Sequence, residues 1–180
     1  MSKLSPLDLE QLAEEGAVRL EMTAGVPTWE AYPSLLHQET IDLIRASIEP
    51  APSHGKGCGC FHFSDISIRF KDGSIKRPDI ALFCTRPPRQ GESVTMVPDA
   101  IIEIISPGYE YKDLYLNPQF YLAQDVGDVV IVEPRSGAVS HFRTTGVSVH
   151  HAPVDLDLLC GCRCSIPQPL PTGDQEDNPS

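Results

Sequence analysis

No stretch of this 180-residue chain is long and apolar enough to span a membrane. The first residues, Met1 to Pro6, also lack the hydrophobic core of a secretory signal. Neither a membrane protein nor an exported protein is therefore expected. We expect a cytoplasmic protein whose six cysteines are thiols or metal ligands rather than disulfides, because the cytosol is reducing.

Basic residues are scarce: 14 lysines and arginines face 25 aspartates and glutamates, for a net charge of -11. Three of the acidic residues, Asp174, Glu176 and Asp177, lie in a polar C-terminal tail, and the rest of the chain remains strongly acidic. This balance argues against a broad positive surface for nucleic acid. It leaves room for a narrow site in which a metal ion neutralises clustered carboxylates.

The length suits one domain, which we place at residues 1–168, with a disordered polar tail at 169–180. Capping residues and helical spacing predict helices at 5–15 and 34–48 and a helical segment within 111–124. Alternating or continuous apolar patterns and turn residues predict strands at 17–23, 27–32, 61–70, 74–83, 98–106, 129–132, 138–143, 147–150 and 156–166. The mixture indicates an α/β fold.

Glu103 is the one charge in the apolar run of residues 100–105, which is typical of a strand buried on both faces. A lone buried carboxylate is expensive unless it is paired or bound to a metal. Asp99, four residues earlier, shares a strand face with Glu103, and Asp79 follows Pro78 in another strand. Converging carboxylates suit Mg²⁺ or Mn²⁺. The alternative is that Glu103 pairs with Arg77 and that the aspartates only begin strands.

Four segments together resemble a known family: RPDI at 77–80, PDAIIEIISP at 98–107, Tyr121, and VVIVEP at 129–134. They are similar to the Uma-two family of restriction-endonuclease-like proteins, which belongs to the PD-(D/E)xK superfamily. The similarity extends roughly from Leu9 to Ile166. It is most specific in the block that runs from Pro-Asp to Glu-Ile-Ile-Ser-Pro.

The resemblance implies a restriction-endonuclease-like core, in which a mixed β-sheet is flanked by helices. It places Asp79 and Glu103 at the two acidic positions, with Mg²⁺ or Mn²⁺ between them and Asp99 in support. The activity that it implies is hydrolysis of phosphodiester bonds in nucleic acid, with DNA as a possible partner and a homodimer as a possible acting form, and it leaves open whether the substrate is DNA or RNA. Glu21 and His37 match family positions at which a side chain could serve as an outer ligand of the metal.

One position departs from the family pattern. The family has a lysine four residues before the tyrosine, and here that position is Asn117. Because Pro118 follows, we favour a helix-capping role for Asn117 over a catalytic one. Lys112 could replace the missing lysine, although an exposed, unpartnered lysine is the simpler interpretation. The alternative function is therefore a catalytically inactive domain that acts as a binding or interaction module.

The cysteines suggest a second metal hypothesis. Cys58 and Cys60 form one pair, and Cys160, Cys162 and Cys164 alternate along an expected strand, so four thiolates could hold zinc. Zinc motifs usually place two residues between paired cysteines, and here only one intervenes. We favour the interpretation that small, weakly apolar cysteines pack in the sheet, and zinc is not expected.

Overall fold

The computed structural model describes residues 19–23, 25–30, 33–52, 58–89, 91, 93–106, 108 and 110–171. The helix expected at 5–15 and the tail from 172 onward lie outside these residues. Within the described part of the chain, no helix is long and apolar enough to cross a membrane.

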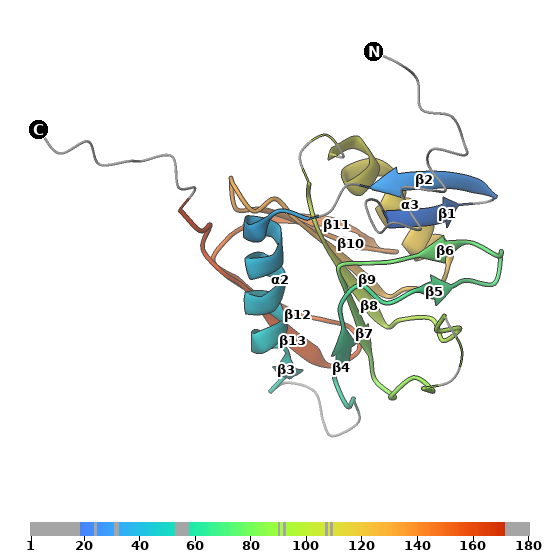
Figure 1. Ribbon diagram of the computed structural model, residues 1–180. Helices are drawn as coiled ribbons and strands as arrows, with labels where there is room; N and C mark the ends of the chain where they lie inside the picture. Colours follow the sequence, from blue (N-terminus) through green and yellow to red (C-terminus); the bar gives the residue numbers. More distant parts are fainter. Residues whose placement is uncertain are drawn as a thin grey trace, which may run out of the picture.

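A six-stranded mixed sheet forms the centre of the molecule (Figure 1), in the order β11-β10-β9-β8-β7-β4. Its strands are β4 (Phe61–Phe63), β7 (Ile80–Phe83), β8 (Ala100–Ile104), β9 (Asp128–Val132), β10 (Ala138–Arg143) and β11 (Gly146–His151). The central pair, β8 and β9, is parallel, and the other neighbours are antiparallel. Every residue of β7, β8 and β9 is buried, as the apolar run in β8 predicts.

Two smaller sheets flank the central one. The first has the order β2-β1-β6-β5 and consists of β1 (Arg19–Thr23), β2 (Val26–Glu30), β5 (Ile68–Arg69) and β6 (Ile75–Lys76). The second has the order β12-β13-β3 and consists of β12 (Val154–Asp157), β13 (Cys162–Ile166) and β3 (Glu49–Pro50). The predicted hairpin at Asp72-Gly73 is confirmed as the β5–β6 turn, where Gly73 adopts a φ of 85°.

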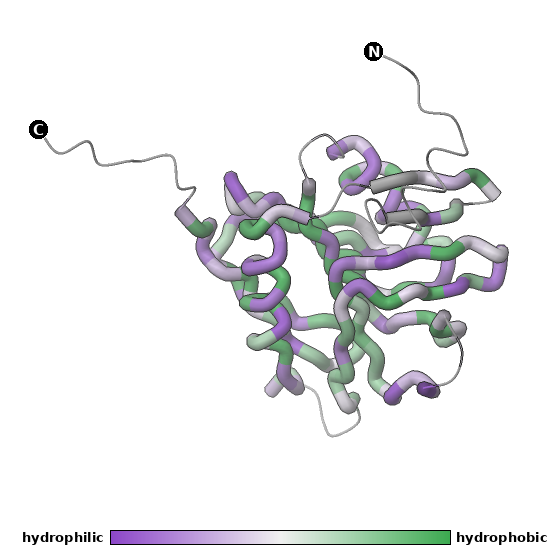
Figure 2. The backbone as a smooth tube through the Cα atoms, viewed as in Figure 1, coloured by the Kyte–Doolittle hydropathy of each residue, from purple (hydrophilic) through white to green (hydrophobic). Residues whose placement is uncertain are grey.

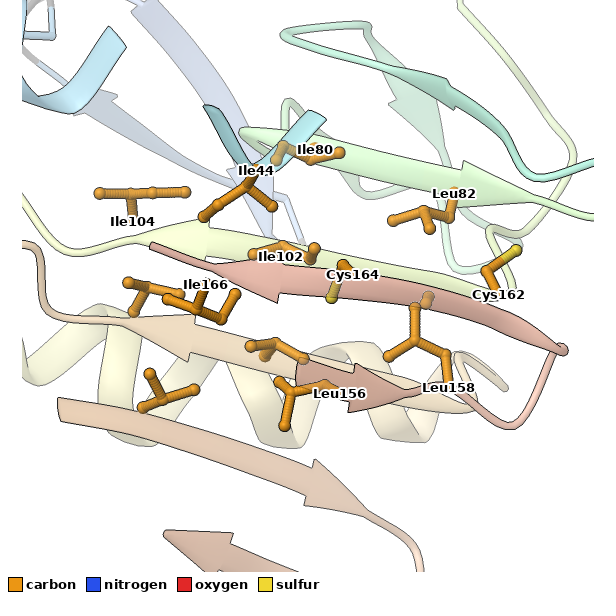
Figure 3. Close-up of a cluster of buried hydrophobic side chains, with 14 of the residues drawn as sticks. Ile44, Ile80, Leu82, Ile102, Ile104, Leu156, Leu158, Cys162, Cys164 and Ile166 are labelled. Atoms are coloured by element: carbon orange, nitrogen blue, oxygen red, sulfur yellow. The ribbon is translucent and has the colours of Figure 1, made fainter. Parts of the chain in front are cut away.

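Helix α2 (Leu35–Ser47) and the sheet containing β13 cover one face of the central sheet (Figures 1 and 3). Ile44 of α2, Ile102 of β8 and Ile166 of β13 belong to this core. The start of α2 follows the sequence prediction, because the Ser34 side chain accepts a hydrogen bond from the His37 backbone N–H at 3.3 Å. The tube in Figure 2 is hydrophobic along the central strands that these elements cover.

The opposite face of the central sheet is covered by a helical segment that connects β8 to β9. It comprises a π-helical turn, η1 (Lys112–Leu116), followed by α3 (Asn117–Ala123). Tyr121 from α3 packs with Ile101 and Ile131 in this second core. The mixed sheet with helices on both faces is the restriction-endonuclease-like α/β architecture that the sequence predicted.

Three of the predicted strands each prove to contain two strands. The strand expected at 61–70 is divided into β4 and β5, and the strand expected at 74–83 is divided into β6 and β7. The chain changes sheets around Pro78, which has no N–H to donate to a ladder. The strand expected at 156–166 is a hairpin of β12 and β13, which turns at Gly161 with a φ of 89°.

The expectation for the cysteines was wrong for four of the six. Cys58 is disulfide-bonded to Cys84, and Cys60 is disulfide-bonded to Cys162. Cys160 and Cys164 are free thiols. Local sequence spacing did not reveal these pairs because each joins segments that only the three-dimensional fold brings together.

Candidate functional site

Asp79 and Glu103 lie side by side where β7 and β8 pair. The Asp79 backbone N–H donates to Glu103 Oε2 at 3.0 Å, and Asp79 Oδ2 accepts from the Ile104 backbone N–H at 2.8 Å. Each residue is only 7% exposed. The two acidic positions singled out in the sequence are thus brought together, and each carboxylate is oriented by the backbone of the other strand.

Helix α2 supplies a histidine to this pair. His37 Nε2 lies 2.9 Å from Asp79 Oδ1, and the other ring nitrogen, Nδ1, lies 3.1 Å from Ser106 Oγ. The imidazole is buried and held at both nitrogens, so its orientation is fixed. His37 therefore lies beside Asp79, as the resemblance implied.

Tyr121 holds Glu103 from α3, since its hydroxyl donates to Glu103 Oε1 at 2.7 Å. Burial and the neighbouring Glu103 raise the pKa of Tyr121 well above its usual value, so this hydroxyl keeps its proton and remains a donor. Both oxygens of Glu103 thus accept a hydrogen bond.

Lys76 is one of two site residues that the sequence interpretation missed, and Asp113 is the other. The Lys76 ammonium donates to Glu21 Oε2 at 3.0 Å and to Asn117 Oδ1 at 3.4 Å, and the residue is only 3% exposed. Regular strand alternation would have turned it away from Asp79, three residues later. The break at Pro78 removes that alternation. The one sequence signal was a lysine shortly before the Pro-Asp pair.

Asn117 is not the N-cap residue of α3, so that capping prediction was wrong, although α3 does begin at Asn117. It has helical φ and ψ of -61° and -46° and follows directly on η1, and the N-cap residue of α3 is Leu116. Its amide donates to Asp113 Oδ1 at 3.1 Å and its oxygen accepts from Lys76. Asn117 therefore links a buried aspartate to a buried lysine.

Lys112 is not an exposed lysine, so the simpler interpretation of it was wrong. Its side chain is 17% exposed, and its ammonium lies 3.7 Å from Glu21 Oε2 and 3.7 Å from Asp113 Oδ1. The π-helical turn directs it toward the same acidic residues. Glu21 receives a further hydrogen bond from the Arg77 backbone N–H at 3.0 Å.

The observed contacts of Asp99 and Arg77 contradict two other interpretations of the sequence. Asp99 does not join Glu103, because its carboxylate accepts from the Cys84 backbone N–H at 2.6 Å, beyond the other end of β7. Arg77 does not pair with Glu103 either, because its guanidinium is bonded to Asp65 at 3.2 Å. The alternative in which Glu103 is neutralised by Arg77 is therefore excluded.

Glu21, Asp79, Glu103 and Asp113 form what we call the carboxylate cluster. Burial and the nearby Asp79 raise the pKa of Glu103 well above its usual value. Burial also raises the pKa of Asp113 from 3.8 to about 6, with Asp79 and Glu21 adding to the rise against the opposing charge of Lys112. Burial would raise the pKa of Glu21 too, but Lys76 and Lys112 outweigh it and lower that pKa. Among the described residues, the four carboxylates thus face two ammonium groups, those of Lys76 and Lys112, and Asp79 also contacts His37.

Replacing Asp113 with asparagine should stabilise the metal-free fold near neutral pH. The folded protein binds more protons than the unfolded chain between pH 3.8 and about 6, so its free energy of unfolding falls as pH rises through that interval. The rise in pKa corresponds to at most about 3 kcal/mol. Urea denaturation with EDTA at pH 4.5 and pH 7 should show a smaller loss of stability for Asp113→Asn than for the wild type.

The matched control is Asp42→Asn on the exposed side of α2. It should leave the difference between the two pH values as it is in the wild type. If Asp113→Asn also leaves that difference unchanged, the carboxyl group of Asp113 does not destabilise the fold in the way its surroundings imply.

Comparisons with known proteins agree with this architecture. The Uma2 family, described as "Putative restriction endonuclease", matches residues 6–159. A solved structure titled as a putative nuclease belonging to DUF820, from Anabaena variabilis ATCC 29413, superposes with a TM-score of 0.58. It is 21% identical, and the match covers 74% of this chain and 77% of that chain. A search among curated proteins finds no match.

The family match extends over most of the chain and includes every member of the carboxylate cluster. The structural likeness, at 21% identity, independently supports the fold. The chain belongs to the Uma2 family, whose description is "Putative restriction endonuclease".

Proposed function

We propose that this protein is a nuclease that hydrolyses phosphodiester bonds with the help of a divalent metal ion at Asp79 and Glu103. The observation that carries the proposal is the excess of negative charge in the carboxylate cluster. Four buried carboxylates face the two ammonium groups of Lys76 and Lys112, and two of the carboxyl pKa values are raised. A divalent cation would balance that excess without protons.

The donor set fits a hard ion such as Mg²⁺ or Mn²⁺. Carboxylate oxygens are the ligands these ions prefer, and Mg²⁺ is commonly held by one or two carboxylates together with water and substrate phosphate. Asp79 and Glu103 each have hydrogen bonds that orient both oxygens, which leaves further lone pairs for an ion. When bound, such an ion activates water and stabilises charge on the phosphate.

Within this proposal, Lys76 supplies the positive charge that the family draws from position 117. Its ammonium lies 3.4 Å from Asn117 Oδ1, so the charge stands close to the place where the family lysine would reach. Asn117 and Glu21 hold the ammonium in position. His37 and Tyr121 act as positioning residues, because each fixes one of the two acidic side chains.

Nucleic acid is the proposed substrate class, and an arginine-lined pocket offers contacts to its phosphates. Arg86 and Arg89 line this pocket, and so do Arg77 and Asp65, which are bonded to each other. Arginine suits phosphate recognition because its planar guanidinium can donate two parallel hydrogen bonds. The pocket borders the carboxylate cluster through Arg77, whose backbone N–H donates to Glu21. A local basic patch can serve a chain whose overall charge is negative.

The alternative function, a catalytically inactive binding module, was motivated by the neutral Asn117. The neutral Asn117 is now a weaker argument for an inactive domain, because a lysine from β6 lies within hydrogen-bonding distance of it. The acidic net charge of -11 still favours a narrow substrate contact over a wide one.

Supercoiled plasmid, single-stranded DNA and RNA should be incubated separately with the wild type in Mg²⁺ or Mn²⁺. We expect cleavage of at least one of them, its loss with EDTA, and a loss of at least about 100-fold for Glu103→Gln. Glutamine keeps the acceptor for Tyr121 but removes the charge. If none of the three is cut although Mn²⁺ binds, the binding-module alternative replaces the nuclease.

A further inference from the structure

Five of the six cysteines gather at one place, remote from the carboxylate cluster. They come from three segments: the approach to β4, the end of β7, and the turn into β13. The five are Cys58, Cys60, Cys84, Cys160 and Cys162. We call them the cysteine cluster. Cys164, two residues further along β13, is buried in the core and outside it.

The sulfur atoms of this cluster form two groups of three that share one member. Those of Cys58, Cys84 and Cys160 lie within 4.8 Å of one another, and so do those of Cys58, Cys60 and Cys162. The two disulfides also touch, since Cys58 Sγ lies 3.3 Å from Cys162 Sγ. With zinc–sulfur bonds of 2.3 Å, the sulfurs of a tetrahedral site stand about 3.8 Å apart. Cys58 is the member common to both groups.

We propose that, in the reduced protein, the cysteine cluster is a structural metal site that binds one Zn²⁺ through four thiolates. Cys58 is a ligand, and three of the other four cluster members complete the tetrahedron. Thiolates are soft ligands that select zinc over Mg²⁺, and a closed four-sulfur site is the usual form of structural zinc. The proposal does not depend on the nuclease function.

The backbone is shaped to hold the three segments together. The Gly59 N–H donates to the Cys84 carbonyl at 2.8 Å, and a side chain at Gly59 would overlap the ring of Phe61. Cys60 has a φ of 44°, the left-handed conformation that is uncommon for a residue other than glycine. Cys84 Sγ also lies 3.3 Å from the Cys160 carbonyl oxygen. These contacts bring the sulfurs together independently of any one disulfide.

An ion can reach the cluster from solvent. Cys58, Cys84 and Cys160 are partly exposed, whereas Cys60 and Cys162 are buried. Cys160 also lines an open surface pocket with Pro98 and Leu159. Figure 3 shows Cys162 at the end of the core between β13 and the central sheet. A metal here would tie the edge strand β4 to β7 and to the small sheet of β13.

The change from disulfides to a metal site balances in electrons and protons. Each disulfide accepts two electrons from a phosphine reductant and two protons from water, and the phosphine is oxidised to the phosphine oxide with the oxygen of that water. Binding of Zn²⁺ by four thiols then releases four protons to the buffer. The oxidised protein, with Cys58–Cys84 and Cys60–Cys162 intact, lacks these thiolates and should not bind the ion in this way.

The two candidate metal sites lie at opposite ends of β7. Asp79 precedes Ile80 and Cys84 follows Phe83, so five residues of extended chain, roughly 16 Å, separate them. The sites also differ in chemistry, with oxygen ligands at one end and sulfur ligands at the other. Each can therefore be tested without disturbing the other.

Protein reduced with a phosphine and dialysed against limiting Zn²⁺ should retain about one zinc per chain by elemental analysis. Cobalt substituted at the site should give the absorption of tetrahedral thiolate-bound Co²⁺, a signature that binding at carboxylates cannot produce. Chelation should lower the thermal midpoint of the reduced protein by more than about 5 °C. Protein without reductant should retain no zinc.

Cys58→Ser should abolish zinc retention and the cobalt spectrum, whereas Cys164→Ser should leave both unchanged. Cys164 is the matched control because it is a free, buried cysteine on the same hairpin. The cobalt titration of the wild type keeps the test valid if Cys58→Ser fails to fold. Reduced wild type without zinc or a thiolate–cobalt spectrum overturns the proposal, and so does wild-type binding by Cys58→Ser.

Discussion

Asp79→Asn should weaken Mn²⁺ binding by at least about 100-fold, beyond the effect expected for loss of an outer ligand. The substitution keeps the shape of the side chain and an oxygen that can accept from His37 or Ile104, but it removes the negative charge. Calorimetric titration of Mn²⁺ into EDTA-stripped, metal-free protein measures this directly. Mn²⁺ is the suitable probe because it prefers oxygen to thiolate ligands, so the cysteine cluster does not compete.

Asp99→Asn is the matched control for this titration. Asp99 was expected to support the metal, but its carboxylate accepts from the Cys84 backbone N–H, a bond that asparagine can retain. The variant should bind Mn²⁺ as the wild type does. If Asp79→Asn binds equally well, the carboxylate cluster is not the metal site. If Asp99→Asn is the variant that loses binding, the ion lies at the other end of β7.

The parts of the fold that could be predicted were those in which one local sequence pattern determines the secondary structure and its burial. The run at residues 100–105 requires burial on both faces, and Ser34 together with the spacing of Ile41 and Ile44 requires a helix against the core. The predictions failed where the chain changes sheets. Residues 61–83 contribute to two sheets, and the contacts that separate β6 from β7 are made with residues far away in the sequence.

In the candidate site, too, the residues fixed by a local motif could be predicted, and those fixed by contacts far away in the sequence could not. Asp79, Glu103 and His37 could be placed together from their motif, because the pairing of β7 with β8 fixes the first two. Lys76 and Asp113 could not be placed. The position of Lys76 depends on β1 pairing with β6, which brings Glu21 beside it. The position of Asp113 depends on a π-helical turn that local propensity does not reveal.

The charges of the carboxylate cluster also bear on the anionic substrate that we propose for a protein with a net charge of -11. The four carboxylates of the cluster are buried together, so their charge acts within the site. In the metal-free protein, the raised pKa values of Glu103 and Asp113 show that ionisation of these buried, neighbouring carboxyl groups is unfavourable. A bound divalent cation would replace those protons and neutralise the excess negative charge of the carboxylate cluster.

Removing the lysine at position 76 should lower cleavage, and adding a lysine at position 117 to that variant should restore it. Lys76→Gln removes the ammonium, and we expect cleavage to fall by about 100-fold or more while Mn²⁺ binding persists. Asn117→Lys alone places a second ammonium near Lys76, which like-charge repulsion disfavours. The double variant returns one lysine and one amide to the pair, so its activity should recover to within about tenfold of the wild type. The measurement is the cleavage rate of all four proteins, which forms a double-mutant cycle.

Lys71→Gln is the control for loss of a lysine from the same hairpin. Its side chain is 81% exposed and pairs with Asp125, so the variant should cleave at the wild-type rate. Recovery in the double variant would mean that the site needs a positive charge near Asn117 but not a particular strand or helix to carry it. If Lys76→Gln cleaves normally, or the double variant is no better than Lys76→Gln, the charge does not come from Lys76. Lys112, at 3.7 Å from Glu21, would then be the cation that remains to account for activity.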